Sequence, residues 1–194
     1  MCYYEINVSL INKPLRILLA TDTLVLIAGA MLVPYYALFV EKIGGDILDT
    51  GLAAGAYAVA AGFATLAAGR WSDRVKRKEF IVGGAYLMMA ACFVAYLFVH
   101  SLWALLIVQV LLGLAQATYV PAYDALYGAH VGGTRTASFR WSFWEASNFF
   151  AIAVGALAGA TIVHLANFSG LLLTMATLCV LSGFYLFTLP KRAV

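Results

Sequence analysis

The sequence predicts an all-α integral membrane protein with six transmembrane helices in a single domain covering residues 1–194. Its residues are 64% hydrophobic and only 11% charged, whereas a soluble domain is about half apolar and about one quarter charged. Long apolar segments recur along the chain, each near the ~20 residues that cross a ~30 Å hydrocarbon core as a helix. These segments lack the alternation of a membrane barrel strand, and helix is the other structure that satisfies backbone groups in lipid.

The six segments follow one another along the whole chain. Their expected ranges are 15–40, 51–68, 80–99, 102–127, 137–164 and 169–189. The first follows residues without the basic region and cleavage site of a signal peptide, so we expect it to be retained as a helix. Cys92 and Cys179 lie inside the third and sixth segments without a metal-type spacing, which indicates small apolar packing residues.

Basic residues predict the orientation of the helices. Of the 12 lysines and arginines, 11 flank one side of the predicted bundle and Lys42 alone flanks the other. Because cytoplasmic loops collect lysine and arginine, we expect both termini and the loops after the second and fourth helices to be cytoplasmic. This topology accounts for the net charge of +3, so no nucleic-acid partner is implied.

A weak internal repeat relates the first and fourth helices. At an offset of 87 residues, five of nine positions match. The pairs are Ala28 with Ala115, Ala30 with Ala117, Val33 with Val120, Pro34 with Pro121 and Tyr36 with Tyr123. Because the two helices run in opposite directions, the pattern predicts an inverted repeat of three plus three helices, about 14–100 and 101–190. Chance matching in an apolar background is the alternative.

The loop between the second and third helices carries the most specific motif. Residues 69–78 match the pattern G-x-x-x-D-R-x-G-R-R/K at Gly69, Asp73, Arg74, Arg77 and Lys78. The pattern resembles the signature of the major facilitator superfamily, although Lys76 stands where that family usually has glycine. A generic basic cytoplasmic loop is the alternative, but it requires neither the glycine nor the acid.

A second resemblance points to the drug-exporter branch of that family. Asp22 is followed by Pro34 in the first helix, as in those exporters, whereas Gln109 stands where many members have arginine. The resemblance implies one N-terminal half of a transporter that moves a small molecule by alternating access. It further implies that the loop motif, through Asp73 and Arg74, steadies the conformation closed to the cytoplasm.

A half of this kind predicts a partner, because polar side chains facing a central path would otherwise meet lipid. The simplest partner is a second copy, giving a homodimer of twelve helices. Small residues allow close helix contacts, and we expect the second helix of one copy to pack on the fifth of the other. The expected interface glycines are Gly55, Gly62, Gly155 and Gly159. Packing within one subunit explains these glycines equally well.

The candidate substrate path lies on polar faces of the first, fourth and fifth helices. Its residues are Asp22, Tyr35, Tyr36, Gln109, Gln116, Tyr119, Tyr123, Glu145 and Asn148. Tyrosines can stack on substrates, and an intramembrane acid is by default a functional-site hypothesis, here for coupling to protons. The alternatives are structural hydrogen bonds for the tyrosines, and helix-to-helix bonds or salt bridges to Arg16 or Arg140 for the acids.

The spans contain no paired catalytic acids, metal-type spacing or nucleophile motif, so we expect no enzyme activity, metal or cofactor. The predicted function is transport of a small molecule in the plasma or inner membrane. The alternative is a non-transporting membrane subunit, either a binding or assembly component or one half of a split transporter.

Overall fold

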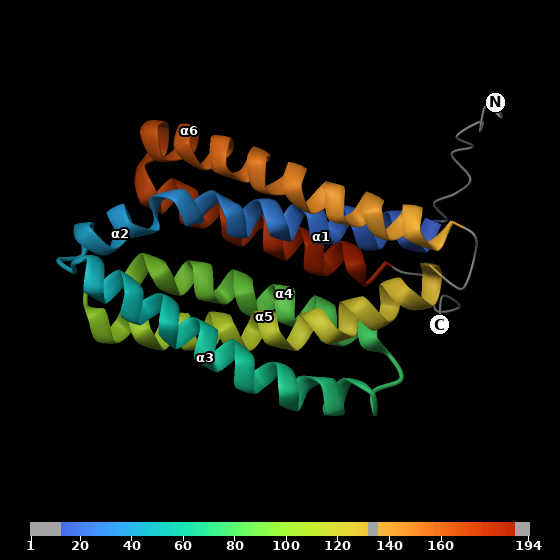
Figure 1. The fold of residues 1–194 in the computed structure, drawn as a ribbon. Helices are drawn as coiled ribbons and strands as arrows, with labels where there is room; N and C mark the ends of the chain where they lie inside the picture. Colours follow the sequence, from blue (N-terminus) through green and yellow to red (C-terminus); the bar gives the residue numbers. More distant parts are fainter. Residues whose placement is uncertain (1–12, 132–135, 189–194) are drawn as a thin grey trace.

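The computed structural model describes residues 13–131 and 136–188, and all regular structure in these two ranges is helical. The helices lie side by side along a common direction (Figure 1). Their bounds are α1 Lys13–Leu32, η2 Val33–Tyr35, α2 Tyr36–Lys42, α3 Ile47–Ser72, α4 Lys78–Ala95, η3 Tyr96–Phe98, α5 Leu102–Val131 and α6 Ala137–Leu186. The prediction of an all-helical membrane fold agrees with this arrangement.

Five stretches are long and apolar enough to cross a membrane. They are Lys13–Lys42, Ile47–Ser72, Lys78–Phe98, Leu102–Val131 and Ala137–Leu186. The last stretch, α6, contains 50 residues and is interrupted at Asn167, where the backbone has φ 60° and ψ −177°. At this point the chain reverses, so that the orange part of α6 runs toward the left of Figure 1 and the red part runs back toward the right. These parts correspond to the predicted ranges 137–164 and 169–189, although the helix ends at Leu186 and Leu189 lies outside the described residues.

The first stretch is a bent helix rather than the continuous one predicted over 15–40. α1 ends at Leu32, and Val33, Pro34 and Tyr35 form a single 3-10 turn before α2 continues to Lys42. Proline causes the interruption because it lacks an N–H group and its ring clashes with the preceding turn. Pro121, its counterpart at the repeat offset, lies inside the unbroken helix α5.

Polar caps extend α3 beyond its predicted start at residue 51. The Asp49 N–H donates to Asp46 Oδ1 at 2.9 Å, and the Asp46 N–H donates to Asp49 Oδ2 at 3.1 Å. This reciprocal capping box satisfies backbone donors at the helix start. The predicted range missed this first turn, in which the apolar residues Ile47 and Leu48 are followed by the polar residues Asp49 and Thr50.

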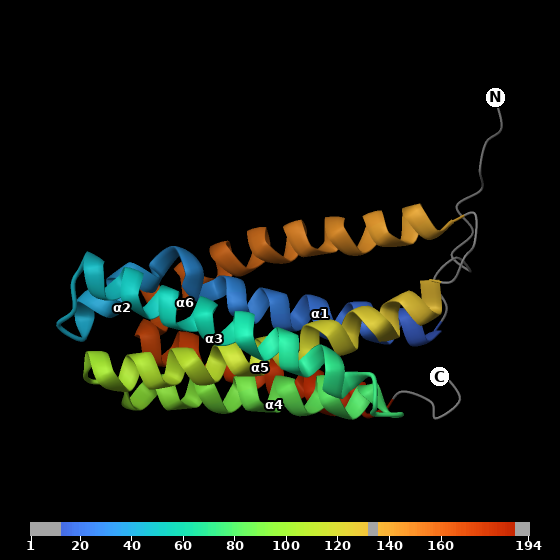
Figure 2. The same cartoon turned by 60° about the horizontal axis from the view of Figure 1, so that its bottom comes forward.

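The helices pack in two pairs joined by α4. α1 packs mainly on α6, α3 packs mainly on α5, and α4 contacts both α5 and α6. The first part of α6 lies on one side of α1, and α4 and α5 lie on the other (Figure 2). The core between them is filled by large apolar and aromatic side chains, including Tyr86, Phe93, Leu171 and Met175. α3 and the first part of α6 stand at the edges and bury few of their residues.

The connections alternate between the two ends of the bundle. The start of α1, the turn between α3 and α4, the end of α5 and the end of α6 lie at the right of Figure 1, and the turn at Gly44 and the reversal at Asn167 lie at the left. The basic motif after α3 therefore lies at the same end as Lys13 and Arg16.

Candidate transport site

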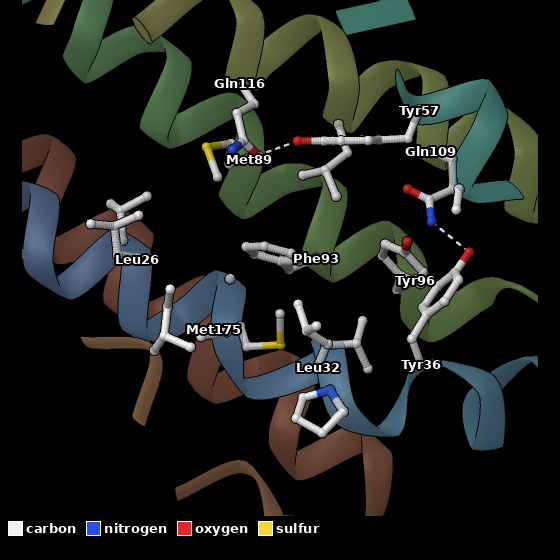
Figure 3. Close-up of a pocket in the computed structure, with 18 of the residues that line it drawn as sticks. Leu26, Leu32, Tyr36, Tyr57, Met89, Phe93, Tyr96, Gln109, Gln116 and Met175 are labelled. Atoms are coloured by element: carbon white, nitrogen blue, oxygen red, sulfur yellow. Dashed lines mark hydrogen bonds between the residues drawn. The ribbon is translucent and has the colours of Figure 1, made fainter. Parts of the chain in front are cut away.

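A pocket of about 490 Å³ lies between the two helix pairs. α1, α3, α4, α5 and α6 all contribute to its wall, and Phe93 of α4 points into its middle (Figure 3). Four of the predicted path residues line it, namely Tyr36, Gln109, Gln116 and Tyr119. The remaining wall is formed mostly by aliphatic side chains and by Met89 and Met175. An apolar pocket with a few polar groups is the usual form of a small-molecule site.

Two hydrogen bonds between residues that line this pocket join one helix to another. Gln109 Nε2 donates to the Tyr36 hydroxyl, which links α5 to α2. The Tyr57 hydroxyl donates to Gln116 Oε1 at 2.6 Å, which links α3 to α5 (Figure 3). Tyr57 was not among the predicted path residues. The sequence could have indicated Tyr57, because it is a single tyrosine among glycines and alanines in the first half of α3.

Asp22 lies outside the lining of the pocket, in a cluster of aromatic rings. Only 2% of the residue is exposed. Trp144 Nε1 donates to Asp22 Oδ2 at 2.8 Å, and the Tyr86 hydroxyl donates to Oδ1 at 3.5 Å. Within the described residues this acid has neither of the predicted salt bridges, and Arg140 instead donates to the carbonyls of His130 and Val131 at 3.0 Å each.

Tyr119 connects the acid cluster to the pocket. It lines the pocket, and its ring meets the ring of Tyr86 edge to face, with centroids 5.2 Å apart. Tyr123 stacks on Trp144 at 6.0 Å, and its buried hydroxyl has no hydrogen-bond partner among the described residues. Packed rings therefore connect the surroundings of Asp22 to the pocket.

The repeat offset of 87 residues relates the pocket to the acid cluster. The offset places Asp22 on Gln109 and Tyr36 on Tyr123. Gln109 bonds Tyr36 in the pocket, and Tyr123 packs on the tryptophan that bonds Asp22. The first stretch thus supplies Tyr36 to the pocket and Asp22 to the acid cluster, and α5 supplies Gln109 to the pocket and Tyr123 to the cluster.

The sequence profile of the Major Facilitator Superfamily matches residues 18–194. The chain belongs to the Major Facilitator Superfamily. This membership confirms the family that the loop motif indicated, and the family is one of transporters rather than enzymes.

Relatives in the superfamily include bacterial proteins named for drug resistance. The multidrug resistance protein MdtG of Dickeya zeae is 25% identical over 189 residues, which cover 93% of this chain and 45% of that protein. MdtG of Salmonella typhimurium is 28% identical over 192 residues, covering 94% of this chain and 45% of that protein. An uncharacterized MFS-type transporter of Bacillus subtilis, YhjO, is 31% identical over 115 residues, which cover 59% of this chain and 28% of YhjO. The chain thus spans about half the length of the MdtG relatives.

The other predicted path residues are not among those that line the pocket. Tyr35 donates its hydroxyl to the Ala156 carbonyl at 3.1 Å, which ties η2 to α6. Asn148 is half-buried, and its Oδ1 has no partner among the described residues. Glu145 was expected to be partly buried but is exposed, because it lies on the outer face of α6.

Two of the four predicted interface glycines are used inside the chain. A Cβ atom at Gly155 would lie 2.6 Å from the Ile27 carbonyl oxygen, and one at Gly159 would fall even closer to the Met31 carbonyl oxygen. The prediction that these two glycines face a second copy is therefore corrected, since α1 already occupies the space beside them. A Cβ atom at Gly55 or Gly62 would have nothing within 4 Å, and both glycines lie on an exposed face of α3.

The superfamily motif forms the turn between α3 and α4. Arg77 Nε pairs with Glu79 Oε1 at 2.7 Å, and Lys78 Nζ donates to the Ser72 carbonyl at 2.8 Å. Asp73 and Arg74 are exposed and form no ion pair within the described residues. A Cβ atom at Gly69 would meet nothing within 4 Å, so no close contact inside the chain requires glycine at this position.

Proposed function

We propose that this chain forms one half of a facilitator-type transporter that moves a small molecule across the membrane by alternating access. The observation that carries the proposal is the pocket, which lies between two helix pairs and whose wall contains the Tyr36–Gln109 and Tyr57–Gln116 hydrogen bonds. Rocking one pair against the other would break the Tyr36–Gln109 bond, which joins them, and expose the pocket to one face of the membrane. Membership of the superfamily supports the same function.

The proposed topology has six crossings, with α6 contributing two of them on either side of Asn167. Repeats about 14–100 and 101–190 would then be inverted copies. The matched contacts of α1 on α6 and α3 on α5 support this, as do the exchanged roles of the residues at offset 87. The basic loops would place both termini in the cytoplasm, at the plasma or inner membrane.

The proposed partner is a second six-helix unit, and the simplest is a second copy of this chain. α3 exposes Phe63 and Leu66, and the first part of α6 exposes Phe149 and Phe150. Glu145 is exposed on the same part of α6. A charged side chain facing lipid costs at least ~2.5 to 3.5 kcal/mol on insertion scales. Cover by a partner over this part of α6 would remove that cost.

The proposed coupling group is Asp22, which would exchange a proton during the cycle. As a carboxylate it accepts the Trp144 hydrogen bond, and as a neutral acid it could itself donate, for instance toward the unpartnered Tyr123 hydroxyl. Such a rearrangement would shift the packed rings that connect to Tyr119. Tyr119 in turn lines the pocket.

Flux in proteoliposomes tests the proposal. Purified chain is reconstituted with and without a pH gradient, and labelled sugars, metabolites and lipophilic cations are screened. We expect gradient-driven flux of at least one of them, and its loss in Asp22→Asn with exchange across equal pH retained. Glu41→Gln, which alters an exposed acid of α2, is the matched control and should keep full flux. Full gradient-driven flux in Asp22→Asn would remove the proton-coupling role, and binding without any flux would favour the non-transporting subunit.

A further inference from the structure

The pocket carries no ionisable acid or base among the described residues that line it. No aspartate, glutamate, lysine, arginine or histidine is among them. Its polar groups are the amides of Gln109 and Gln116 and a few tyrosine hydroxyls. The buried acid of the same bundle, Asp22, lies outside the lining and is already bonded to Trp144.

A cationic ligand would be poorly compensated in such a pocket. The effective cost of burying an ion is several kcal/mol, even after relaxation of the protein. Contact with an aromatic face such as that of Phe93 returns only ~0.5 to 2 kcal/mol. Burial of apolar ligand surface gives the same gain to neutral and charged molecules of one shape. The electrostatic difference therefore favours the neutral one.

The pocket also offers one hydrogen-bonding group that protein contacts leave incomplete. Gln116 is half-buried and uses one end of its amide for Tyr57, so the other end is free among the described residues to meet a ligand. Gln109 is 6% exposed and is bonded to Tyr36, so it is less available. Met89 and Met175 give the wall flexible, polarizable side chains that adapt to flat ring systems.

We propose that this pocket selects uncharged, largely apolar ring compounds that carry a group able to hydrogen-bond to Gln116. It discriminates against the cationic analogues of these compounds. The inference rests on the proposed function for the role of the pocket as a transport site. It names the class of substrate that the site takes.

A matched pair of dyes tests the selectivity. Nile red is uncharged and has a ring carbonyl, and Nile blue is a cation built on the same ring system. Binding is measured in lipid nanodiscs containing the full chain, with empty nanodiscs subtracted. We expect Nile red to bind at least roughly tenfold more tightly than Nile blue, which corresponds to ~1.4 kcal/mol.

Two variants of Gln116 make the test specific to the pocket. Gln116→Leu should weaken the binding of Nile red several-fold, because it removes the amide. The binding of Nile blue should stay weak in this variant. Gln116→Glu should raise Nile blue affinity at least roughly tenfold, because a carboxylate then compensates the cation. Asn167→Asp, which adds the same charge at the exposed reversal of α6, should leave both affinities unchanged.

The outcomes separate this inference from the proposed function. Equal or tighter binding of Nile blue by the unaltered chain, an unchanged preference in Gln116→Glu, or binding of neither dye would each overturn the selectivity. Flux is measured on the same preparations. Selective binding of Nile red without flux of any solute would contradict transport and leave the selectivity standing. Flux of Nile blue in preference to Nile red would support transport and contradict the selectivity.

Discussion

Asp22 is held inside the bundle by aromatic donors rather than by a basic side chain. Its Oδ2 accepts from Trp144 Nε1, a residue 122 positions later in the chain, and its Oδ1 accepts from Tyr86 at a longer distance. Hydrogen bonds to a charged group are stronger than those between neutral groups, and losing one leaves a buried acceptor without compensation. The shorter bond should therefore contribute more to stability than an ordinary polar contact.

Trp144→Phe tests that contribution. The variant keeps an aromatic ring but removes the donor, and we expect it to destabilise the folded protein by ~1.5 to 3 kcal/mol. Thermal unfolding in detergent, followed by the fluorescence of a thiol-reactive dye on Cys92 and Cys179, would measure the shift. Trp103→Phe is the control, because Trp103 is 77% exposed and should show little change.

A double-mutant comparison identifies the partner. If Trp144 acts through the Asp22 carboxylate, then Trp144→Phe should cost clearly less in an Asp22→Asn background. Equal costs in the two backgrounds would show that the tryptophan stabilises the bundle by packing alone.

At the residue scale, the sequence predicted four polar side chains that share a pocket but not the side chains that they contact. Gln109, Gln116, Tyr36 and Tyr119 were predicted as pocket residues from their spacing on two helices, and they line one pocket. Their partner Tyr57 was missed, because helical spacing describes one helix and says nothing of which side chain of another helix lies opposite. The exposure of Glu145 was missed for the same reason.

At the scale of elements, hydropathy located the helices and local chemistry decided their ends. The expected range 102–127 corresponds to α5, Leu102–Val131, and the expected range 80–99 corresponds to α4 with η3. The bend at Pro34 and the capping box at Asp46 depend on single residues that an apolar pattern averages away. The reversal at Asn167 fell in the short gap between two predicted segments, so the sequence placed it closely.

The contact between α6 and α1 depends on two glycines that let the backbones approach. Gly159 is the more constrained, since a Cβ atom there would overlap the Met31 carbonyl oxygen. We expect Gly159→Ala to destabilise the protein by ~1 to 3 kcal/mol, because backbone cannot move aside as a flexible side chain can. Thermal unfolding in detergent would measure it.

Gly62→Ala provides the matched control for this element. Gly62 is also a glycine inside a helix, but nothing lies within 4 Å of the position of its added methyl group. The control should unfold at the same temperature as the unaltered chain or slightly above it, because alanine is the better helix former. A loss of stability in Gly62→Ala as large as that in Gly159→Ala would mean that helix packing is not what makes Gly159 necessary.

At the scale of the whole molecule, α3 and the first part of α6 leave exposed surfaces that the proposed second copy would cover. α3 presents Gly55 and Gly62 with open space beside them, and exposed aromatic side chains such as Phe63 lie on the same helix. The corrected role of Gly155 and Gly159 moves the expected contact on α6 from its glycines to its exposed aromatic residues. Small residues on one helix facing large ones on the other allow close packing without a second small-residue face.

Leucine substitutions on α3 test this assembly. We expect the purified chain to have the mass of two copies in mild detergent, and Gly55→Leu combined with Gly62→Leu to have the mass of one, because the added side chains fill the space that a partner helix needs. Gly84→Leu is the control. Gly84 lies on an exposed face of α4 and also has nothing within 4 Å, so its variant should keep the mass of two copies. Native mass spectrometry would give the masses. A single-copy mass for the unaltered chain would contradict the homodimer, and an unchanged mass for the α3 variant would move the interface away from this helix.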